Sequence, residues 1–280
     1  MSKRLLNLGC GRRFHADWEN VDFVALAPAI KAHDLRQGIP YGDESFDVVY
    51  HSHLLEHFPK KTAPLFLREC RRVLKREGVI RIAVPDLEKI ARAYLEAFEK
   101  ASQGVPTWKE KYDWMMLELY DQAVRERSGG ACFDYLRSDP VPNWDYILER
   151  AGAEAVAARD AARAEHGIQV AQRAGFGDKW GYVFRNLGQV LRNKLKLAVL
   201  SDYEREALEL GKFRRQGEIH QWMYDSYSLA RLLIEVDFSS PQRCEPTESQ
   251  IPNWATYCLD SEIDGAIYKP DSMYMEAVKS

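Results

Sequence analysis

Two short segments of the chain carry residue types that could bind or transform a ligand. In the first, the apolar run Leu5–Leu8 leads into Gly9-Cys10-Gly11, and Asp22 follows eleven residues after the second glycine. Glycines at the end of a strand let the backbone approach a ligand closely, and a carboxylate can accept hydrogen bonds from ribose hydroxyls. The third glycine of the dinucleotide fingerprint is absent, so the pattern predicts a nucleotide-type site without identifying the nucleotide.

The second segment is the run Tyr50-His51-Ser52-His53-Leu54-Leu55-Glu56-His57, which holds three of the seven histidines. Histidine titrates near neutral pH, so His53 or His57 could act as a general base. If the segment is helical, these two side chains lie four residues apart on one face. The alternative is that the polar groups cap the segment or bond to the backbone.

Residues 53–57 also spell His-x-x-Glu-His, the inverted zinc-peptidase motif. Two histidines at this spacing can bind one zinc ion, with the glutamate as base. That motif belongs on a long helix and needs a third ligand downstream. Here it follows a strand and a glycine turn, and no distinctive third ligand is evident. We therefore expect no metal ion at this site.

Alternating strands and helices must position these two segments. β-Branched and aromatic runs predict strands at 5–8, 20–24, 30–33, 46–50 and 79–84, and helical spacing predicts a helix at 62–76. This order predicts an α/β fold with a doubly wound, mostly parallel sheet. Because ligands bind beyond the carboxyl ends of parallel strands, the two polar segments should face one crevice.

The character of the sequence changes after the fifth strand. Residues 87–100, 108–120, 144–166 and 182–211 read as helices, and strands are expected again at 243–247 and 272–278. The chain therefore divides into three expected parts. These are a cofactor-binding part at 1–88, a large helical insertion or lid at 89–218, and a C-terminal part at 219–280 that completes the sheet.

Composition limits the functional classes. The 280 residues include 39 basic and 42 acidic side chains, and a net charge of −3 does not suggest a nucleic-acid binder. No apolar stretch reaches the roughly 20 residues of a membrane span, and no signal-peptide core follows the N-terminus. The five cysteines include no Cys-x-x-Cys pair. We expect a reduced, cytoplasmic protein.

An ordered series of motifs through residues 4–86 resembles the Rossmann-like S-adenosylmethionine-dependent methyltransferases. The motifs are Leu5-Leu6-Asn7-Leu8-Gly9-Cys10-Gly11, Asn20-Val21-Asp22, His33-Asp34-Leu35, Asp43-Glu44-Ser45-Phe46-Asp47-Val48-Val49, Leu55-Glu56-His57 and Leu67-Arg68-Glu69-Cys70-Arg71-Arg72-Val73-Leu74-Lys75. The subgroup it resembles is the small-molecule one related to quinone-biosynthesis enzymes, the methyltransferase type 11-like group. Two features depart from the pattern. Asn7 stands where an acid is usual, and only about two turns of helix fit between Gly11 and Asn20.

The resemblance implies S-adenosyl-L-methionine as cofactor and a role for each matched residue. The implied cofactor-binding set is Asn7, Gly9, Cys10, Gly11, Asp22, Asp34, Leu35, His51 and Ser52. The turn at 9–11 would pass under the methionine part, residue 22 would bind the ribose hydroxyls, and residues 34 and 35 would lie at the adenine. Residues 51 and 52 would flank the methionine amine and carboxylate. The implied catalytic candidates, His53 and His57, would line the methyl-acceptor side.

We therefore expect an enzyme (EC 2.1.1) that methylates a small molecule, for instance a sugar, a nucleotide sugar or another secondary metabolite, beneath a helical lid. A nucleotide-sugar or dinucleotide binder and a non-catalytic S-adenosylmethionine binder remain alternatives. A nucleic-acid partner is not expected. The basic stretch that contains Arg185, Arg192, Lys194, Lys196, Lys212, Arg214 and Arg215 is more typical of a solvated helix face than of a phosphate-binding stripe. The sequence leaves the acceptor and the oligomeric state open.

Overall fold

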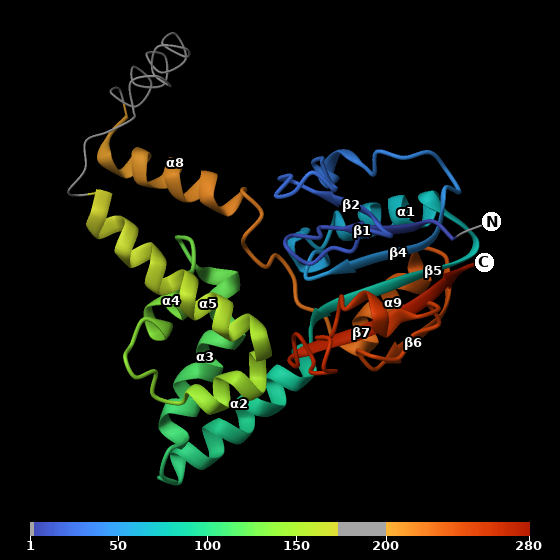
Figure 1. Cartoon of the computed structure of the whole chain (residues 1–280). Helices are drawn as coiled ribbons and strands as arrows, with labels where there is room; N and C mark the ends of the chain where they lie inside the picture. The colour runs from blue at the N-terminus through green and yellow to red at the C-terminus, as the bar shows by residue number, and fades with distance from the viewer. Residues whose placement is uncertain (1–2, 173–199) are drawn as a thin grey trace.

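The computed structural model describes residues 3–172 and 200–280, which form a sheet part and a helical part (Figure 1). Within these residues, seven strands make one sheet in the order β3-β2-β1-β4-β5-β7-β6. β7 runs antiparallel to both of its neighbours, and the other neighbouring strands are parallel. The strands are β1 (Leu5–Leu8), β2 (Glu19–Asp22), β3 (Ile30–Ala32), β4 (Phe46–Ser52), β5 (Leu74–Pro85), β6 (Phe238–Cys244) and β7 (Ser272–Lys279). The predicted α/β fold with a mostly parallel sheet is confirmed.

The register of the central strands brings the two polar segments to one edge of the sheet. β1 lies between β2 and β4, and Leu8 near its end is paired with Val21 on one side and His51 on the other. The carboxyl ends of these three parallel strands therefore lie side by side. The chain leaves β1 at Gly9 and β4 at His53, so both turns emerge at the same edge.

Two amphipathic helices, α1 (Ala63–Val73) and α9 (Ser226–Glu235), cover one face of the sheet. Phe66, Cys70 and Val73 recur along α1 at helical spacing and are buried in the main core, while basic side chains occupy the outer side of its last turn. Burial of each large apolar side chain of this kind stabilises the fold by about 1.5–3 kcal/mol.

The opposite face is covered by loops that carry aromatic side chains. Trp18 packs edge-on against Tyr50 of β4 and against Trp254, which begins the 3₁₀ turn η3 (Trp254–Tyr257). The resemblance implies a short helix between Gly11 and Asn20. This prediction is wrong, because residues 11–18 form turns and bends instead. The aromatic cluster, built from distant segments, fills the space against the sheet there.

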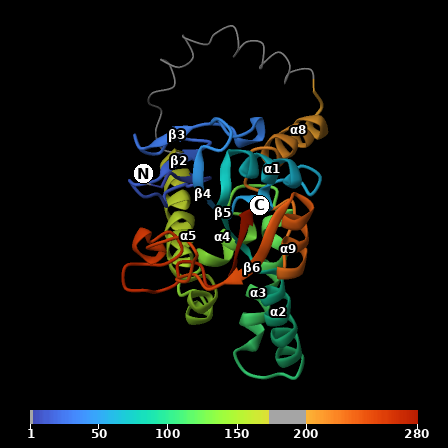
Figure 2. The ribbon, with the colours of Figure 1, turned by 90° about the vertical axis from the view of Figure 1, so that its right-hand side faces the viewer.

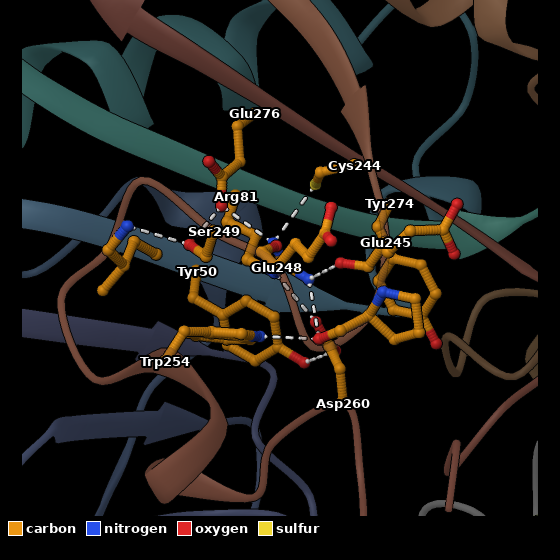
Figure 3. Close-up of polar contacts among 12 residues, drawn as sticks. Tyr50, Arg81, Cys244, Glu245, Glu248, Ser249, Trp254, Asp260, Tyr274 and Glu276 are labelled. Atoms are coloured by element: carbon orange, nitrogen blue, oxygen red, sulfur yellow. Dashed lines mark hydrogen bonds and ion pairs between the residues drawn. The ribbon is translucent and has the colours of Figure 1, made fainter. Parts of the chain in front are cut away.

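A buried arginine ties β5 to the C-terminal loop (Figure 3). The Arg81 side chain is fully buried, and it donates from Nε to Asp260 and from Nη1 to Glu276, at 2.8 Å in each case. Its other acceptors are the Cys244 thiol and the carbonyl oxygens of Glu245, Pro246 and Glu248. The Tyr50 hydroxyl donates to the same Asp260 carboxylate at 2.6 Å. This network fixes residues 244–260 over the sheet.

The helical part follows β5 directly. Its helices within the described residues are α2 (Leu87–Ser102), α3 (Trp108–Val124), α4 (Gly130–Leu136), α5 (Trp144–Gln172) and α8 (Asp202–Arg214). α2 to α5 enclose a second core around Ile90, Trp114 and Ile147, whereas α8 buries none of its side chains. Figures 1 and 2 show α2 to α5 standing to one side of the sheet and α8 returning toward it. The predicted helices at 87–100, 108–120 and 144–166 are confirmed, and residues 182–199 of the fourth lie outside the described part.

Asp86 makes the junction between the sheet part and the helical part. Its buried carboxylate accepts hydrogen bonds from the N–H groups of Glu88 and Lys89, which caps α2. The same carboxylate accepts from the Arg243 guanidinium at 2.7 Å, and the Asp86 N–H donates to the Asp271 carbonyl. α2 therefore continues from β5 without a flexible linker.

A second contact between the two parts depends on a glycine. α5 is kinked at Gly152, whose φ is +58°. A Cβ atom at this position would lie 2.7 Å from Cδ of Pro270 and 2.8 Å from the Tyr268 carbonyl oxygen, so the loop can approach only a glycine this closely. Lys269, between these two residues, pairs with Glu154 of α5 at 3.0 Å.

Two further elements differ from the sequence-based expectation. β6 begins at Phe238 rather than at residue 243, since Asp237 takes a left-handed conformation (φ +65°) and turns the chain out of α9 at once. The run Leu55–His57 is a single 3₁₀ turn, η2, and not part of a longer helix. None of the helices in residues 3–172 and 200–280 combines the length and apolar character that a bilayer crossing requires.

Candidate functional site

A cavity of about 530 Å³ opens beyond the carboxyl ends of β1, β2 and β4. Six of the residues predicted from the sequence line it: Gly9, Asp22, Asp34, Leu35, His53 and His57. Its volume lies in the range of about 300–1,000 Å³ that is usual for small-molecule sites. The structure thus brings the glycine turn and the histidine run together in one cavity, as the parallel-sheet argument requires.

The turn after β1 touches the turn after β4 at Gly9. Gly9 has a φ of +64°, and a Cβ atom there would lie 2.9 Å from Cδ1 of Leu54. The Gly9 N–H donates to the Val21 carbonyl at 2.8 Å, which also ties this turn to β2. A side chain at position 9 would therefore have to displace the end of the Leu54 side chain, which lines the same cavity.

Asp22 is held in position by backbone hydrogen bonds. Its Oδ2 accepts from the Gly11 N–H at 2.8 Å, and its Oδ1 accepts from the Val24 N–H at 3.2 Å. A carboxylate has about four acceptor sites, so about two remain beyond these bonds, and Asp22 lines the cavity. A fixed carboxylate with free lone pairs is suited to a ligand that presents two neighbouring hydroxyl groups.

Asp34 is occupied by a neighbour that the sequence reading did not single out. The guanidinium of Arg36 donates to both Asp34 carboxylate oxygens, at 2.8 and 2.9 Å, and these bonds lower the pKa of that carboxyl. Arg36 also lies 5.7 Å from the Phe23 ring and donates to the Arg215 carbonyl at 3.1 Å. The pair therefore joins the cavity wall to the chain that leaves α8.

Five residues of the predicted set are not among those that line the cavity: Asn7, Cys10, Gly11, His51 and Ser52. The Asn7 amide donates to the carbonyl of Arg13 and to the Asn20 side chain. Burial raises the pKa of the Cys10 thiol to about 12. Burial likewise lowers the pKa of His51, whose ring nitrogens have no hydrogen-bond partner, to about 3. Asn7, Cys10 and His51 thus occupy buried positions behind the site, and their cofactor contacts stay predictions.

His53 stands at the exit of β4 in a conformation that is uncommon for a side-chain-bearing residue (φ +50°). Its Nε2 lies 2.7 Å from the Ser272 Oγ, and its Nδ1 lies 3.4 Å from the Glu56 Oε1. Burial and the nearby Lys269 ammonium lower the pKa of His53 well below its ordinary value. The imidazole is therefore neutral at pH 7.

His57 faces the cavity from η2 and is oriented by the chain that follows α8. Its Nδ1 donates to the Ile219 carbonyl at 3.1 Å, and its ring lies edge-on to the His220 ring with 4.9 Å between centroids. Burial lowers the pKa of His57. Because Nδ1 carries the proton, the Nε2 lone pair is free to accept a proton or a hydrogen bond. His53 and His57 line the same cavity although a single 3₁₀ turn, and not a continuous helix, lies between β4 and α1.

Glu56 is fully buried between these histidines. Neither oxygen of its carboxyl group has a hydrogen-bond partner, and burial raises its pKa to about 8. Sequence reasoning treated it only as part of a motif, and it did not connect Glu56 with His220, which lies 164 positions downstream.

Much of the rest of the cavity wall comes from apolar side chains and from the chain after α8. These residues include Phe23, Leu54, Phe58, Leu65, Phe66, Gln216 and Gly217. Phe23 and Leu54 directly follow predicted site residues, so proximity to the motifs could have identified them. Gln216 and Gly217 gave no signal in the sequence, because their position depends on the path of the helical part.

Part of the chain is similar to a known family. Residues 16–82 match a family model described as a methyltransferase domain. The match covers β2, β4 and most of β5 and includes Asp22, His53 and His57, but not the turn at Gly9. No curated protein matches the chain. The family match supports a methyltransferase domain in the segment that carries the candidate histidines.

Solved structures show weaker similarity. The CurJ carbon methyltransferase is 9% identical, with 100% of this chain and 49% of that chain covered and a TM-score of 0.39. A methyltransferase from Mesorhizobium loti described as S-adenosylmethionine-dependent is 19% identical (30% and 47% covered, TM-score 0.25). The 1,6-didemethyltoxoflavin-N1-methyltransferase of Burkholderia thailandensis, solved with S-adenosylhomocysteine, is also 19% identical (30% and 45% covered, TM-score 0.26). The chain spans less than half the length of each, and similarity at this level says nothing about function.

Proposed function

We propose that this protein is an S-adenosylmethionine-dependent methyltransferase that acts on a small-molecule acceptor. The observation that carries the proposal is the single cavity that joins Gly9, Asp22 and His57 at the carboxyl edge of the sheet. The family match over residues 16–82 supports the same activity. We also propose that the protein is related to the quinone-biosynthesis enzymes that its sequence resembles. The division into a cofactor-binding part at 1–88, a helical insertion or lid at 89–218 and a C-terminal part at 219–280 is proposed as well.

The residues of the cavity suit the methyl donor. Asp22 would accept hydrogen bonds from the two ribose hydroxyls, because its carboxylate is fixed by Gly11 and Val24 and keeps free acceptor sites. The backbone at Gly9 lines the same cavity and would lie against the methionine part. Asp34 is paired with Arg36, so we assign the adenine contacts to Leu35 and the neighbouring wall and not to the Asp34 carboxylate.

The histidines suit the acceptor side. Bound S-adenosylmethionine would supply an electrophilic sulfonium methyl group, and most of the catalysis would come from alignment of the acceptor with it. His57 is a neutral imidazole with Nδ1 already donating to Ile219, so its Nε2 can take a proton from an acceptor hydroxyl or ammonium. Gln216 and Gly217 would cover the bound ligands, because they line the same cavity.

The proposal is tested by calorimetry with S-adenosylhomocysteine, NAD and a nucleotide sugar on the full chain. We expect S-adenosylhomocysteine to bind and the other two not to bind. D22A should weaken that binding at least 10-fold, because each hydrogen bond to a charged group contributes about 1.5–3 kcal/mol. The control is D17N, since the Asp17 carboxylate is largely exposed near the same turn.

Three results would count against this assignment. Heat from NAD or a nucleotide sugar with none from S-adenosylhomocysteine would favour a different nucleotide ligand. Equal affinity of D22A and the wild-type protein for S-adenosylhomocysteine would remove Asp22 from the site. Binding of S-adenosylhomocysteine with no methyl transfer to any acceptor in a broad panel would favour a non-catalytic binder.

A further inference from the structure

We propose that Glu56, His57 and His220 form a binding site for one divalent transition-metal ion at the edge of the cavity. Each residue offers one ligand atom, and the three atoms lie within 4.8 Å of one another. His57 belongs to the cavity wall, whereas Glu56 and His220 lie buried behind it. An ion bound there would occupy the free Nε2 lone pair of His57, so metal binding and the general-base role proposed above for His57 exclude each other in the same molecule.

The spacing of the three atoms is close to what an ion requires. Metal–ligand bonds of about 2.0–2.2 Å place the ligands of a tetrahedral zinc ion roughly 3.3–3.5 Å apart. The atoms must therefore close by about 1.5 Å at most, which small side-chain rotations can provide. The Glu56 Oε1 and the His220 Nε2 are already 3.9 Å apart.

The Glu56 carboxyl group lacks a partner, which points to a missing ligand. The residue is fully buried, and both side-chain oxygens are without hydrogen bonds. A buried unpaired polar group costs about 1–3 kcal/mol, and more if charged, so such groups usually meet an ion, a water molecule or a ligand. The Tyr224 hydroxyl near Glu56 is unpartnered as well.

The backbone fixes the position of the ligands. The Glu56 carbonyl accepts hydrogen bonds from the N–H groups of Gln221 and Trp222, at 2.7 and 3.2 Å. These bonds hold the segment that carries His220 directly against η2. The His220 N–H donates in turn to the Gln122 carbonyl of α3, so elements of both the sheet part and the helical part assemble the site.

The hydrogen bond of His57 leaves the correct nitrogen free for a metal. Its Nδ1 donates to the Ile219 carbonyl at 3.1 Å, so the Nε2 lone pair is available. Metal-binding histidines usually donate their other ring N–H to a carbonyl or carboxylate in this way. His53 is a fourth candidate ligand, because its Nδ1 lies 3.4 Å from the Glu56 Oε1.

The donor set indicates the class of metal. Two imidazoles and one carboxylate suit Zn²⁺, Fe²⁺ or Co²⁺ better than Mg²⁺ or Ca²⁺, which prefer oxygen ligands. Three protein ligands leave at least one position open, as in catalytic zinc sites. An open position beside the cavity could take an acceptor oxygen, and that use rests on the proposed function.

The test is metal binding by the full chain after removal of metals with a chelator. Zn²⁺ titration by calorimetry and mass spectrometry of bound metal should show one equivalent per chain, and Co²⁺ should give visible absorption bands. E56Q and H220Q should each weaken Zn²⁺ binding at least about 100-fold, since even loss of an outer hydrogen bond costs about 10–100-fold. H15Q is the control, because His15 is not one of the three proposed ligands and its ring packs edge-on against Tyr257 of η3.

Equal Zn²⁺ affinity and stoichiometry in the wild-type, E56Q and H220Q proteins would overturn the proposal. The ion would then be bound elsewhere, for instance by the five cysteines, which all three proteins retain. Failure of the wild-type protein to bind Zn²⁺ or Co²⁺ would also overturn it, and a higher thermal stability of E56Q would then identify a closed polar cluster. Near-ultraviolet circular dichroism of each variant checks that it is folded, and H57Q provides a further loss-of-ligand variant. Calorimetry with S-adenosylhomocysteine on the same metal-free samples separates this outcome from failure of the proposed function.

Discussion

Replacement of Arg81 by methionine tests the buried ion pairs that join the sheet to the C-terminal loop. The substitution keeps a long, flexible apolar side chain in β5 but removes every guanidinium donor. Asp260 and Glu276, which are almost completely buried, would lose the positive charge between them. The carbonyl oxygens of the loop would lose their donors as well.

The expected loss is about 3–5 kcal/mol in the free energy of unfolding, the usual effect of breaking a buried ion pair from one side. It should lie toward the lower end of that range, because the carboxylates keep other donors. Asp260 still accepts from the Tyr50 hydroxyl, and Glu276 still accepts from Ser249 and from the Gln250 N–H. Typical domains are stable by about 5–15 kcal/mol, so R81M should remain folded with a clearly lower midpoint.

Urea unfolding at pH 7, followed by circular dichroism, measures the effect. The control is R92M, since Arg92 is exposed on α2 and pairs with Glu88 only at the surface. Surface pairs of this kind contribute about 0–1 kcal/mol. A loss for R81M no larger than that of R92M would refute the reasoning, because the buried network would then add nothing to stability.

Three further substitutions test other features. The wild-type protein should lose stability on acidification because of His51, and H51F should not show this loss. Burial holds the pKa of His51 at about 3, so between pH 6.5 and 3 the unfolded chain binds a proton at this residue and the folded chain does not. At about 1.4 kcal/mol per pH unit, the wild-type protein should lose about 2 kcal/mol more than H51F down to pH 5, and parallel pH profiles in urea unfolding would contradict this. G152A should lower stability by about 1–3 kcal/mol through strain at a positive φ and contact with Pro270 and the Tyr268 carbonyl, whereas an unchanged midpoint would show that the loop moves aside freely. G9A should weaken S-adenosylhomocysteine binding at least 10-fold in calorimetry and cost about 1–2 kcal/mol of stability, through backbone strain and contact with Leu54. G11A is the control for strain alone, because Gly11 also has a positive φ but a Cβ atom there meets no neighbour within 4 Å.

Local patterns were sufficient for most of the sheet. The β-branched run of β4 and the alternation of β7 have the correct period, and the position of Gly9 and Asp22 at strand ends follows from parallel pairing alone. The missing helix after β1 could not be foreseen, because Trp18 is held by aromatic partners more than 30 residues away. Local propensity carries no information about such partners.

The candidate site was only partly visible in the sequence for the same reason. Asp22, His53 and His57 lie in short motifs next to strand ends, and they line the cavity. Arg36 turns back on Asp34, a side-chain pairing that motif reading does not reveal. His220 reaches Glu56 only because backbone hydrogen bonds dock its segment on η2. His51 has the residue type of a site but faces the core.

The position of β7 has a consequence for the order of assembly during synthesis. β6 meets the sheet only through β7, which is the later strand in the chain and enters between β5 and β6. While residues 272–279 are still within the ribosome, β5 has an open edge and Arg81 lacks Glu276. Nascent chains should therefore expose that edge until residues 272–279 have left the ribosome, and unpaired strand edges of this kind can associate with other chains.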